Sequence, residues 1–212
     1  GIVFIGVYTL CNQVTHLRGD AGRAVFDWER AIPFVPWTIL PYLSLIGFFA
    51  LSFLVRRQRA QLDCHVAAVA INLWLSATCY LLMPLRFNFE RPMPDGVWGL
   101  LFALLGAADL PYNRAPSLHI SVLLIVWLRL SPLWAGWKKA AFGIWFVLIA
   151  LSVLTTYQHH VIDVPTGVLV GAASVALARR TRRLRFALHD SRLACGHVVC
   201  RHPGRKGAFP TA

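Results

Sequence analysis

Charged residues are scarce in this chain of 212 residues and make up only 14% of it. A soluble domain usually carries about 25% charged and about 45–50% apolar residues, whereas here 57% of the residues are hydrophobic and the mean hydropathy is +0.58. This composition argues against a soluble enzyme, a disordered protein and a collagen-like fibre. The length fits one domain or one compact bundle of membrane helices.

Cysteines are few and scattered, which argues against a disulfide framework. The five cysteines are Cys11, Cys64, Cys79, Cys195 and Cys200. The last two lie near His197 and His202, but their separation is at the loose end of the spacing seen for zinc ligands. We therefore favour reduced thiols over a metal site, and we expect the chain to need no cofactor.

Acidic residues are also scarce: 9 Asp and Glu stand against 21 Lys and Arg, for a net charge of +12. From Arg179 onward, nine basic residues oppose a single acidic one, so this short segment carries a charge of +8. A basic segment that follows an apolar run is typical of a cytoplasmic flank, and it can attract anionic lipid headgroups. Nucleic acid is a weaker alternative, because few aromatic residues interleave the basic ones. We predict a membrane domain over Gly1–Ala178 and a poorly ordered basic cytoplasmic tail over Arg179–Ala212.

Long apolar runs recur along the chain, and a helix needs about 20 apolar residues to cross the hydrocarbon core. We predict an all-α integral membrane protein, a bundle of six transmembrane helices. The predicted spans are Gly1–Val14, Pro36–Val55, His65–Met83, Leu118–Leu128 extended through Leu133–Trp137, Ala140–Thr156 and Val161–Ala178. The shorter apolar insert Val97–Ala108 is expected to lie at the membrane interface or to pack on the bundle.

The loops on one side of these spans hold most of the positive charge, while basic residues on the other side are offset by acidic ones. The positive-inside rule assigns the basic side to the cytoplasm. Both termini are then cytoplasmic, and the loop Pro84–Pro116 with its active-site residues is extracytoplasmic. We predict a multi-pass protein of a plasma membrane, such as a bacterial inner membrane.

Ionisable residues gather on the predicted outer face, where their cost at a membrane span makes them functional candidates. They are Arg86, Arg91, Arg114, His119, His159, His160 and Asp163. The i, i+4 spacing of His159 and Asp163 lets the carboxylate orient the imidazole, whose other nitrogen becomes a nucleophile or base. His119, at the same depth, is placed to protonate a leaving oxygen.

The three arginines supply forked donors for phosphate oxygens, so these residues predict phosphoryl transfer with the arginines binding the substrate. No clustered carboxylates suggest a magnesium site. His160 is expected to be structural or to shape the substrate site. Each residue alone has an ordinary explanation, such as a polar cap for a histidine or a headgroup anchor for Arg91. The combination on one face favours a functional site.

Three motifs in this set resemble those of the type 2 phosphatidic acid phosphatase superfamily, whose patterns read KxxxxxxRP, PSxH and SRxxxxxHxxxD. The matching stretches are Glu90-Arg91-Pro92, Pro116-Ser117-Leu118-His119, and Ser152 followed by His159-His160-Val161-Ile162-Asp163. The resemblance covers about Pro36–Ala178. Two positions depart from it, because Pro84 replaces the lysine of the first motif and Val153 replaces the arginine of the third.

The resemblance implies a six-helix membrane enzyme without a metal. It implies that His159 is a nucleophile that forms a phosphohistidine, with Asp163 as its partner and His119 as the general acid. It also implies that Arg91 and Ser117 hold phosphate oxygens. The two departures are similar to the branch that contains sphingomyelin synthases and inositol phosphorylceramide synthases.

We therefore expect a membrane lipid phosphatase that hydrolyses a phosphomonoester or pyrophosphate. The alternative is a lipid phosphotransferase that moves a phosphoalcohol headgroup between lipids on the same scaffold. A non-catalytic lipid-binding membrane protein is a third interpretation. The expected partners are a lipid phosphate or phospholipid substrate and membrane lipids, without nucleic acid.

Overall fold

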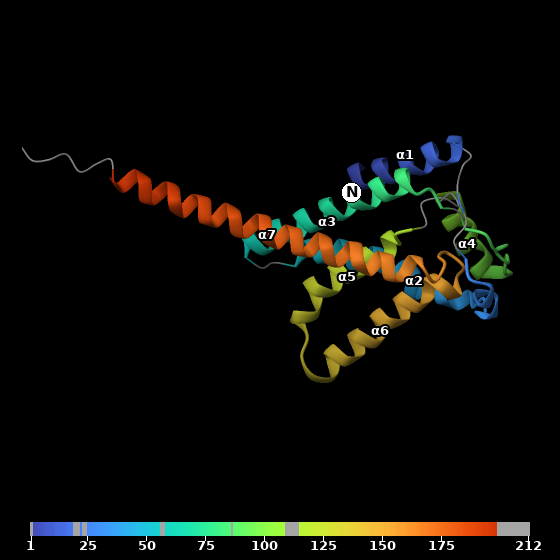
Figure 1. Cartoon of the computed structure of the whole chain (residues 1–212). Coiled ribbons are helices and arrows are strands. Elements are labelled where there is room, and N and C mark those ends of the chain that lie inside the picture. Colours follow the sequence, from blue (N-terminus) through green and yellow to red (C-terminus); the bar gives the residue numbers. More distant parts are fainter. Residues whose placement is uncertain are drawn as a thin grey trace, which may run out of the picture. The chain divides into compact units, whose positions relative to one another are not determined.

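The computed structural model describes residues 2–18, 22, 25–55, 58–85, 87–108 and 115–198, with side chains described between residues 6 and 183. All regular elements in this part of the chain are helical (Figure 1). The α-helices are α1 (Ile2–Arg18), α2 (Ile39–Leu54), α3 (Arg59–Leu82), α4 (Gly96–Ala108), α5 (Leu118–Leu130), α6 (Gly136–Thr155) and α7 (Asp163–Val198). The 3-10 helices are η1 (Asp27–Ala31), η2 (Pro36–Thr38) and η3 (Ser131–Leu133). Contacts divide the chain into two units, Gly1–Ala178 and Arg179–Ala212.

Three helical segments are long and apolar enough to cross a membrane, namely Pro36–Leu54, Arg59–Leu82 and Gly136–Thr155. They correspond to the second, third and fifth predicted spans, although the third begins at Arg59 instead of His65. The predicted all-α class is confirmed for the described residues. The remaining three spans stay predictions, because the described residues of the corresponding helices do not combine the required length with the required apolar character.

The predicted extension of the fourth span through Leu133–Trp137 is wrong. Helix α5 ends at Leu130, and α6 already begins at Gly136. Pro132 in η3 cannot donate a backbone N–H to a continuing helix. Gly136 has φ of 54°, a left-handed conformation that glycine adopts without steric cost and that redirects the chain into α6.

Helix α7 continues beyond the predicted end of the sixth span and runs to Val198. Arg179–Val198 is therefore helical, where we had predicted a poorly ordered tail. Its arginine, leucine and alanine residues have high intrinsic helix propensity, which explains the difference. The side chain of Cys195 and the whole of Cys200 lie outside the described residues, so their assignment as reduced thiols stays a prediction.

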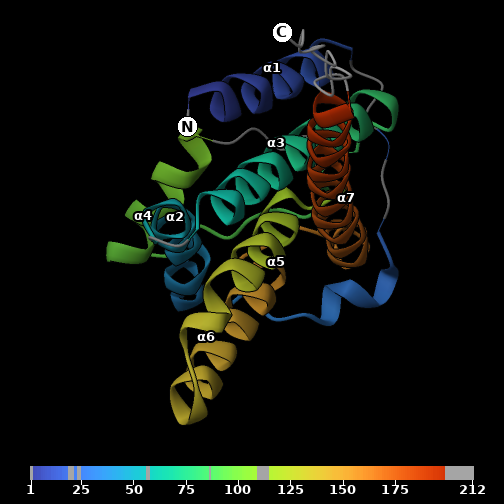
Figure 2. The ribbon, with the colours of Figure 1, turned by 90° about the vertical axis from the view of Figure 1, so that its left-hand side faces the viewer.

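Helix α5 is the central element of the first unit, and it contacts α2, α3 and α6 (Figures 1 and 2). Nine of its 13 residues are buried, as expected for a helix that is apolar around most of its circumference. Val126 and Leu130 belong to the main hydrophobic cluster, together with Ile149 of α6 and Leu45 of α2. Helix α1 packs on α3, and α4 contacts α2, so the apolar insert packs on the bundle.

The backbones of α5 and α7 approach each other closely at two glycines. A Cβ atom on Gly167 would lie 2.6 Å from the carbonyl oxygen of Ser117. A Cβ atom on Gly171, one turn later, would lie 2.9 Å from the carbonyl oxygen of Ser121. Both distances are too short for any side chain, so glycine at these positions lets the start of α7 lie directly against the start of α5.

Arg129 marks the opposite end of α5. Its guanidinium donates to the carbonyl oxygens of Ser52 at 3.3 Å and Val55 at 3.1 Å, and it is only 8% exposed. These carbonyls belong to the last turn of α2, where helical partners are missing and the helix dipole favours a cation. Arg129 therefore stabilises the C-terminal end of α2 from a neighbouring helix.

Candidate functional site

The turn between α6 and α7 presents the two adjacent histidines. The backbone N–H groups of Gln158 and His159 donate to the carbonyl oxygen of Val153, at 3.1 and 3.0 Å, and so close the last turn of α6. Tyr157 adopts φ of 53°, which is a left-handed conformation that costs about 1 kcal/mol or more for a residue with a Cβ. The hydroxyl of Tyr157 donates to the carbonyl oxygen of Ile32 at 2.8 Å, which holds this residue in place.

His159 and Asp163 form a buried pair. Nδ1 of His159 lies 3.2 Å from Oδ2 of Asp163, and their side chains are 8% and 2% exposed. An ionised carboxylate accepts hydrogen bonds only, so Nδ1 carries the proton in this contact. Nε2 of a neutral His159 then holds the lone pair, which gives the ring the tautomer required of a nucleophile or base.

Asp163 connects this pair to the start of α5. Its Oδ2 also accepts the backbone N–H of His160 at 2.9 Å, and its carbonyl oxygen accepts the N–H of Ser117 at 3.1 Å. Asp163 is the first residue of α7, where the positive end of the helix dipole favours a carboxylate. The N-cap residue of α5 and the first residue of α7 are thus joined directly, in addition to the close glycine contact of the two helices.

His119 lies in the first turn of α5, on a platform formed by Tyr42 of α2. The two rings are stacked, with centroids 4.1 Å apart and an interplanar angle of 11°. Nε2 of His119 is buried and has no hydrogen-bond partner within the part of the chain that the structure describes. His119 and His159 lie close enough for a charge on one ring to act on the other.

Arg91 reaches the same turn from the loop before α4. Its Nε–H donates to the carbonyl oxygen of Tyr157 at 2.9 Å, and its guanidinium carbon lies 5.2 Å from the centre of the Phe87 ring. The structure therefore brings Arg91, His119, His159 and Asp163 to one end of the bundle. The other two predicted arginines, Arg86 and Arg114, lie outside the described residues.

His160 has protein partners at both ring nitrogens. Nδ1 lies 2.8 Å from Oε2 of Glu29, and Nε2 accepts the backbone N–H of Asn88 at 3.2 Å. The ring stacks on Phe87 with centroids 4.5 Å apart. Since Nε2 accepts a hydrogen bond, Nδ1 must donate, and His160 is a neutral ring that joins three chain segments. This arrangement favours the structural interpretation of His160 over direct substrate binding.

Glu29 is the site residue that sequence reasoning missed. Its carboxylate is 2% exposed and accepts three N–H groups, from the His160 ring and from the backbones of Val161 at 3.3 Å and Phe26 at 3.1 Å. In the sequence, Glu29 is only one of several acidic residues on that side of the predicted membrane. Its partners in the histidine turn lie 131 and 132 positions away. Glu29 fixes the turn that carries His159.

Two serines of the motifs serve the helices that contain them. The Ser117 hydroxyl is buried and caps α5 by accepting the N–H of Ile120 at 3.3 Å, which leaves its own proton available for donation. Ser152 donates to the carbonyl oxygen of Ile149 at 2.7 Å. Val153, at the position where the motif that this chain resembles has arginine, is completely buried and contributes its carbonyl oxygen to the turn.

Comparison with protein-family models, curated proteins and solved structures finds no match for this chain. The chemistry of the site must therefore be argued from its own side chains. Among the residues that the structure describes, no group of three or more His, Cys, Asp or Glu side chains is arranged to hold a metal ion. The groups present are an oriented imidazole, a second imidazole with an unpartnered nitrogen, and a guanidinium.

Proposed function

We propose that this protein is a membrane-embedded lipid phosphatase that cleaves a phosphomonoester or pyrophosphate through a phosphohistidine. The observation that carries the proposal is the pairing of His159 with the buried carboxylate of Asp163, beside His119 with its unpartnered Nε2. The carboxylate of Asp163 thereby orients the His159 ring. The His119 ring has a nitrogen that can form a hydrogen bond with a substrate atom. In this proposal the chain crosses a plasma membrane six times, with this end of the bundle on the outer face and both termini in the cytoplasm.

In the first step, the Nε2 lone pair of His159 attacks phosphorus and forms a P–N bond. The P–O bond to the lipid breaks, and the leaving oxygen takes a proton from Nε2 of a protonated His119. In the second step, water loses a proton to His119 and attacks phosphorus, which breaks the P–N bond and releases phosphate.

Asp163 stabilises the positive charge that develops on His159 when the ring bonds to phosphorus. Arg91 is assigned to the phosphate oxygens, with Ser117 as a hydroxyl donor and with Arg86 and Arg114 as further basic groups. The guanidinium fork matches the geometry of two phosphate oxygens. His160 is assigned to the shape of the site through its contacts with Glu29 and Phe87.

Val153 supports a second candidate, a lipid phosphotransferase on the same scaffold. A valine that is completely buried contributes no positive charge at the position where the phosphatase pattern has arginine. Fewer fixed charges suit a phosphodiester with one negative charge better than a phosphomonoester with about two. In the transferase, the hydroxyl of a second lipid attacks the phosphohistidine in place of water.

Product analysis with the purified full chain in detergent tests both candidates. A panel of lipid phosphates and phospholipids is incubated with and without a lipid alcohol, and inorganic phosphate and new lipid products are both measured. Release of inorganic phosphate without an acceptor supports the phosphatase. A product that forms only with the lipid alcohol, without phosphate release, overturns hydrolysis and supports the transferase.

Two variants control this assay. His159→Gln removes the assigned nucleophile and is expected to abolish turnover, whereas His16→Gln removes a histidine from an exposed position of α1 and should leave it intact. Absence of turnover with every lipid phosphate and phosphodiester would instead support the non-catalytic, lipid-binding interpretation.

A further inference from the structure

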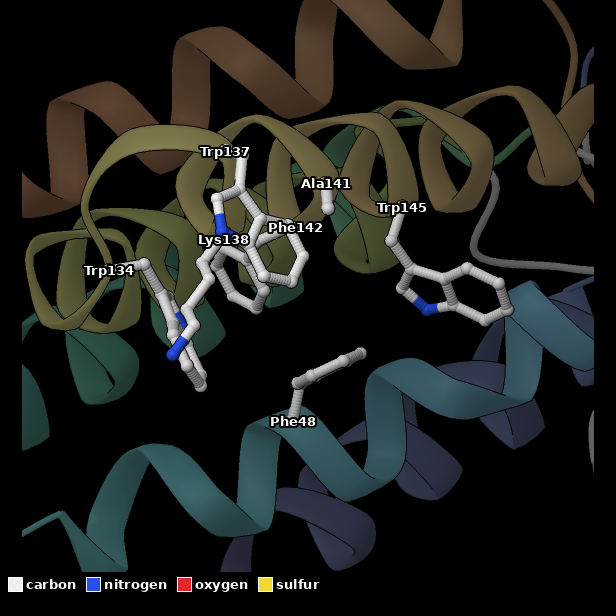
Figure 3. A pocket seen from close by; sticks show the side chains of 7 residues that line it. All are labelled: Phe48, Trp134, Trp137, Lys138, Ala141, Phe142 and Trp145. Atoms are coloured by element: carbon white, nitrogen blue, oxygen red, sulfur yellow. The ribbon is translucent and has the colours of Figure 1, made fainter.

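An aromatic groove lies between α2 and α6, toward the N-terminal end of α6 and away from the histidines. It forms an open depression with a volume of about 420 Å³, within the range of about 300–1,000 Å³ that is usual for small-ligand sites. Figure 3 shows its lining side chains, with Phe48 of α2 facing the aromatic residues of α6. The lining residues are Phe48, Trp134, Trp137, Lys138, Ala141, Phe142 and Trp145.

The walls of this aromatic groove are fixed by contacts within the protein. The indole N–H of Trp145 donates to the hydroxyl of Ser44 at 3.0 Å, which orients this ring against α2. Phe142 stacks on Trp127 with centroids 5.5 Å apart and meets Phe48 edge-on at 5.6 Å. The groove is therefore a preformed surface, and an occupant does not need to order these side chains.

Lys138 supplies the only basic group among the lining residues. Its ammonium lies 5.9 Å from the centre of the Trp137 ring, and Trp137 is 77% exposed. The lysine therefore lies at an open edge of an otherwise apolar surface. A ligand that fits has a long apolar part for the rings and a negative charge for the ammonium.

We infer that the aromatic groove binds one anionic phospholipid, with an acyl chain along the rings and the headgroup phosphate at Lys138. The inference rests on the proposal that these helices cross a membrane, since the helical segments Pro36–Leu54 and Gly136–Thr155 are long and apolar enough to do so. Tryptophan and lysine together are typical of the membrane–water interface. The start of α6 adds positive partial charge at the same level, because its N-cap residue Ala135 provides no side-chain acceptor.

The next residue in the chain offers a matched control. Lys139 is exposed and carries the same charge on the same turn of α6, but it does not line the groove. Diffuse attraction of a basic surface to anionic lipids would depend equally on both lysines. A specific site depends on Lys138 and much less on Lys139.

Fluorescence quenching in reconstituted vesicles tests this inference. The full chain is placed in phosphatidylcholine vesicles that contain a small fraction of brominated phosphatidylglycerol or, in parallel, of brominated phosphatidylcholine. Brominated phosphatidylglycerol is expected to quench tryptophan emission more strongly. Trp137→Phe should remove much of this difference, whereas Trp74→Phe, which removes a tryptophan that is 63% exposed on α3, should preserve it.

The lysine variants give the decisive comparison. Lys138→Gln is expected to lower the preference for phosphatidylglycerol about fivefold, the factor that one basic residue near an anionic membrane contributes, while Lys139→Gln lowers it less than about twofold. Equal losses in the two variants, or equal quenching by the two brominated lipids, would overturn the site and leave the proposed phosphatase untouched. Absence of quenching by either lipid in the unmodified protein would overturn the site together with its membrane premise.

Discussion

Replacement of Glu29 by glutamine should weaken the fold locally, and the structure allows the size of the effect to be derived. The two oxygens of Glu29 accept three N–H groups in a site that is almost completely buried. Glutamine keeps one oxygen and replaces the other by an NH₂ group. At least one of the three N–H groups then faces the new NH₂ group, which is also a donor. The other tautomer of His160 does not remove this conflict, because its Nε2–H would then face the backbone N–H of Asn88.

A buried donor without an acceptor costs about 1–3 kcal/mol. For a domain of this size, each kcal/mol lowers the melting temperature by about 2–4 °C. We therefore expect Glu29→Gln to lower the melting temperature by about 2–12 °C. The loss should extend to turnover, because the same contacts hold the turn that carries His159.

Thermal unfolding of the purified protein in detergent, followed by tryptophan fluorescence, measures this shift. Asp27→Asn is the matched control, since Asp27 is exposed on the same 3-10 helix. Its melting temperature should stay within about 1 °C of the unmodified protein, as for most surface substitutions. Equal melting temperatures for the two variants would refute the assigned role of Glu29.

Three further predictions concern the catalytic pair, the helix contact and the topology. Asp163→Asn should lower kcat by about 10-fold to 10⁴-fold through loss of a charge-assisted hydrogen bond and of the correct tautomer of His159, and an unchanged kcat would exclude the assigned role. Gly167→Ala should destabilise the protein by about 1–3 kcal/mol through overpacking, whereas Gly47→Ala, where a Cβ meets nothing within 4 Å, should be neutral or stabilising in denaturant titrations. In a background without the five native cysteines, Asp95→Cys should react with an impermeant thiol reagent on intact cells, and a reaction seen only after lysis would invert the predicted topology.

Local patterns in the sequence predicted the parts of the site that depend on local geometry. The spacing of His159 and Asp163 predicted that their side chains meet, and these lie 3.2 Å apart. The predicted shared face of a helix is not found, because α7 begins only at Asp163 and His159 lies in the preceding turn. The position of His119 at the start of a helix followed from the apolar run after Ser117. Such contacts can be read from the sequence because they join residues that are only a few positions apart in the chain.

Contacts that depend on the packing of distant segments could not be predicted. Glu29 meets His160 across 131 positions, and the stacking of Tyr42 on His119 joins α2 to α5. Neither contact can be read from a regular spacing in the sequence, because each one depends on how distant segments pack against one another. The end of α5 was missed for a simpler reason: the apolar residues after Leu130 continue the hydrophobic run, although Pro132 and Gly136 interrupt the helix.

The glycine contact between α5 and α7 also restricts access to the histidines. Backbone atoms of α5 occupy the space beside Gly167 and Gly171, so no gap wide enough for an acyl chain separates the two helices at these levels. Lateral access from the bilayer through this seam is closed. In the proposed function, a lipid substrate therefore reaches the site along another flank of the bundle. Substitutions that widen access there are expected to change substrate preference without touching the proposed reacting groups.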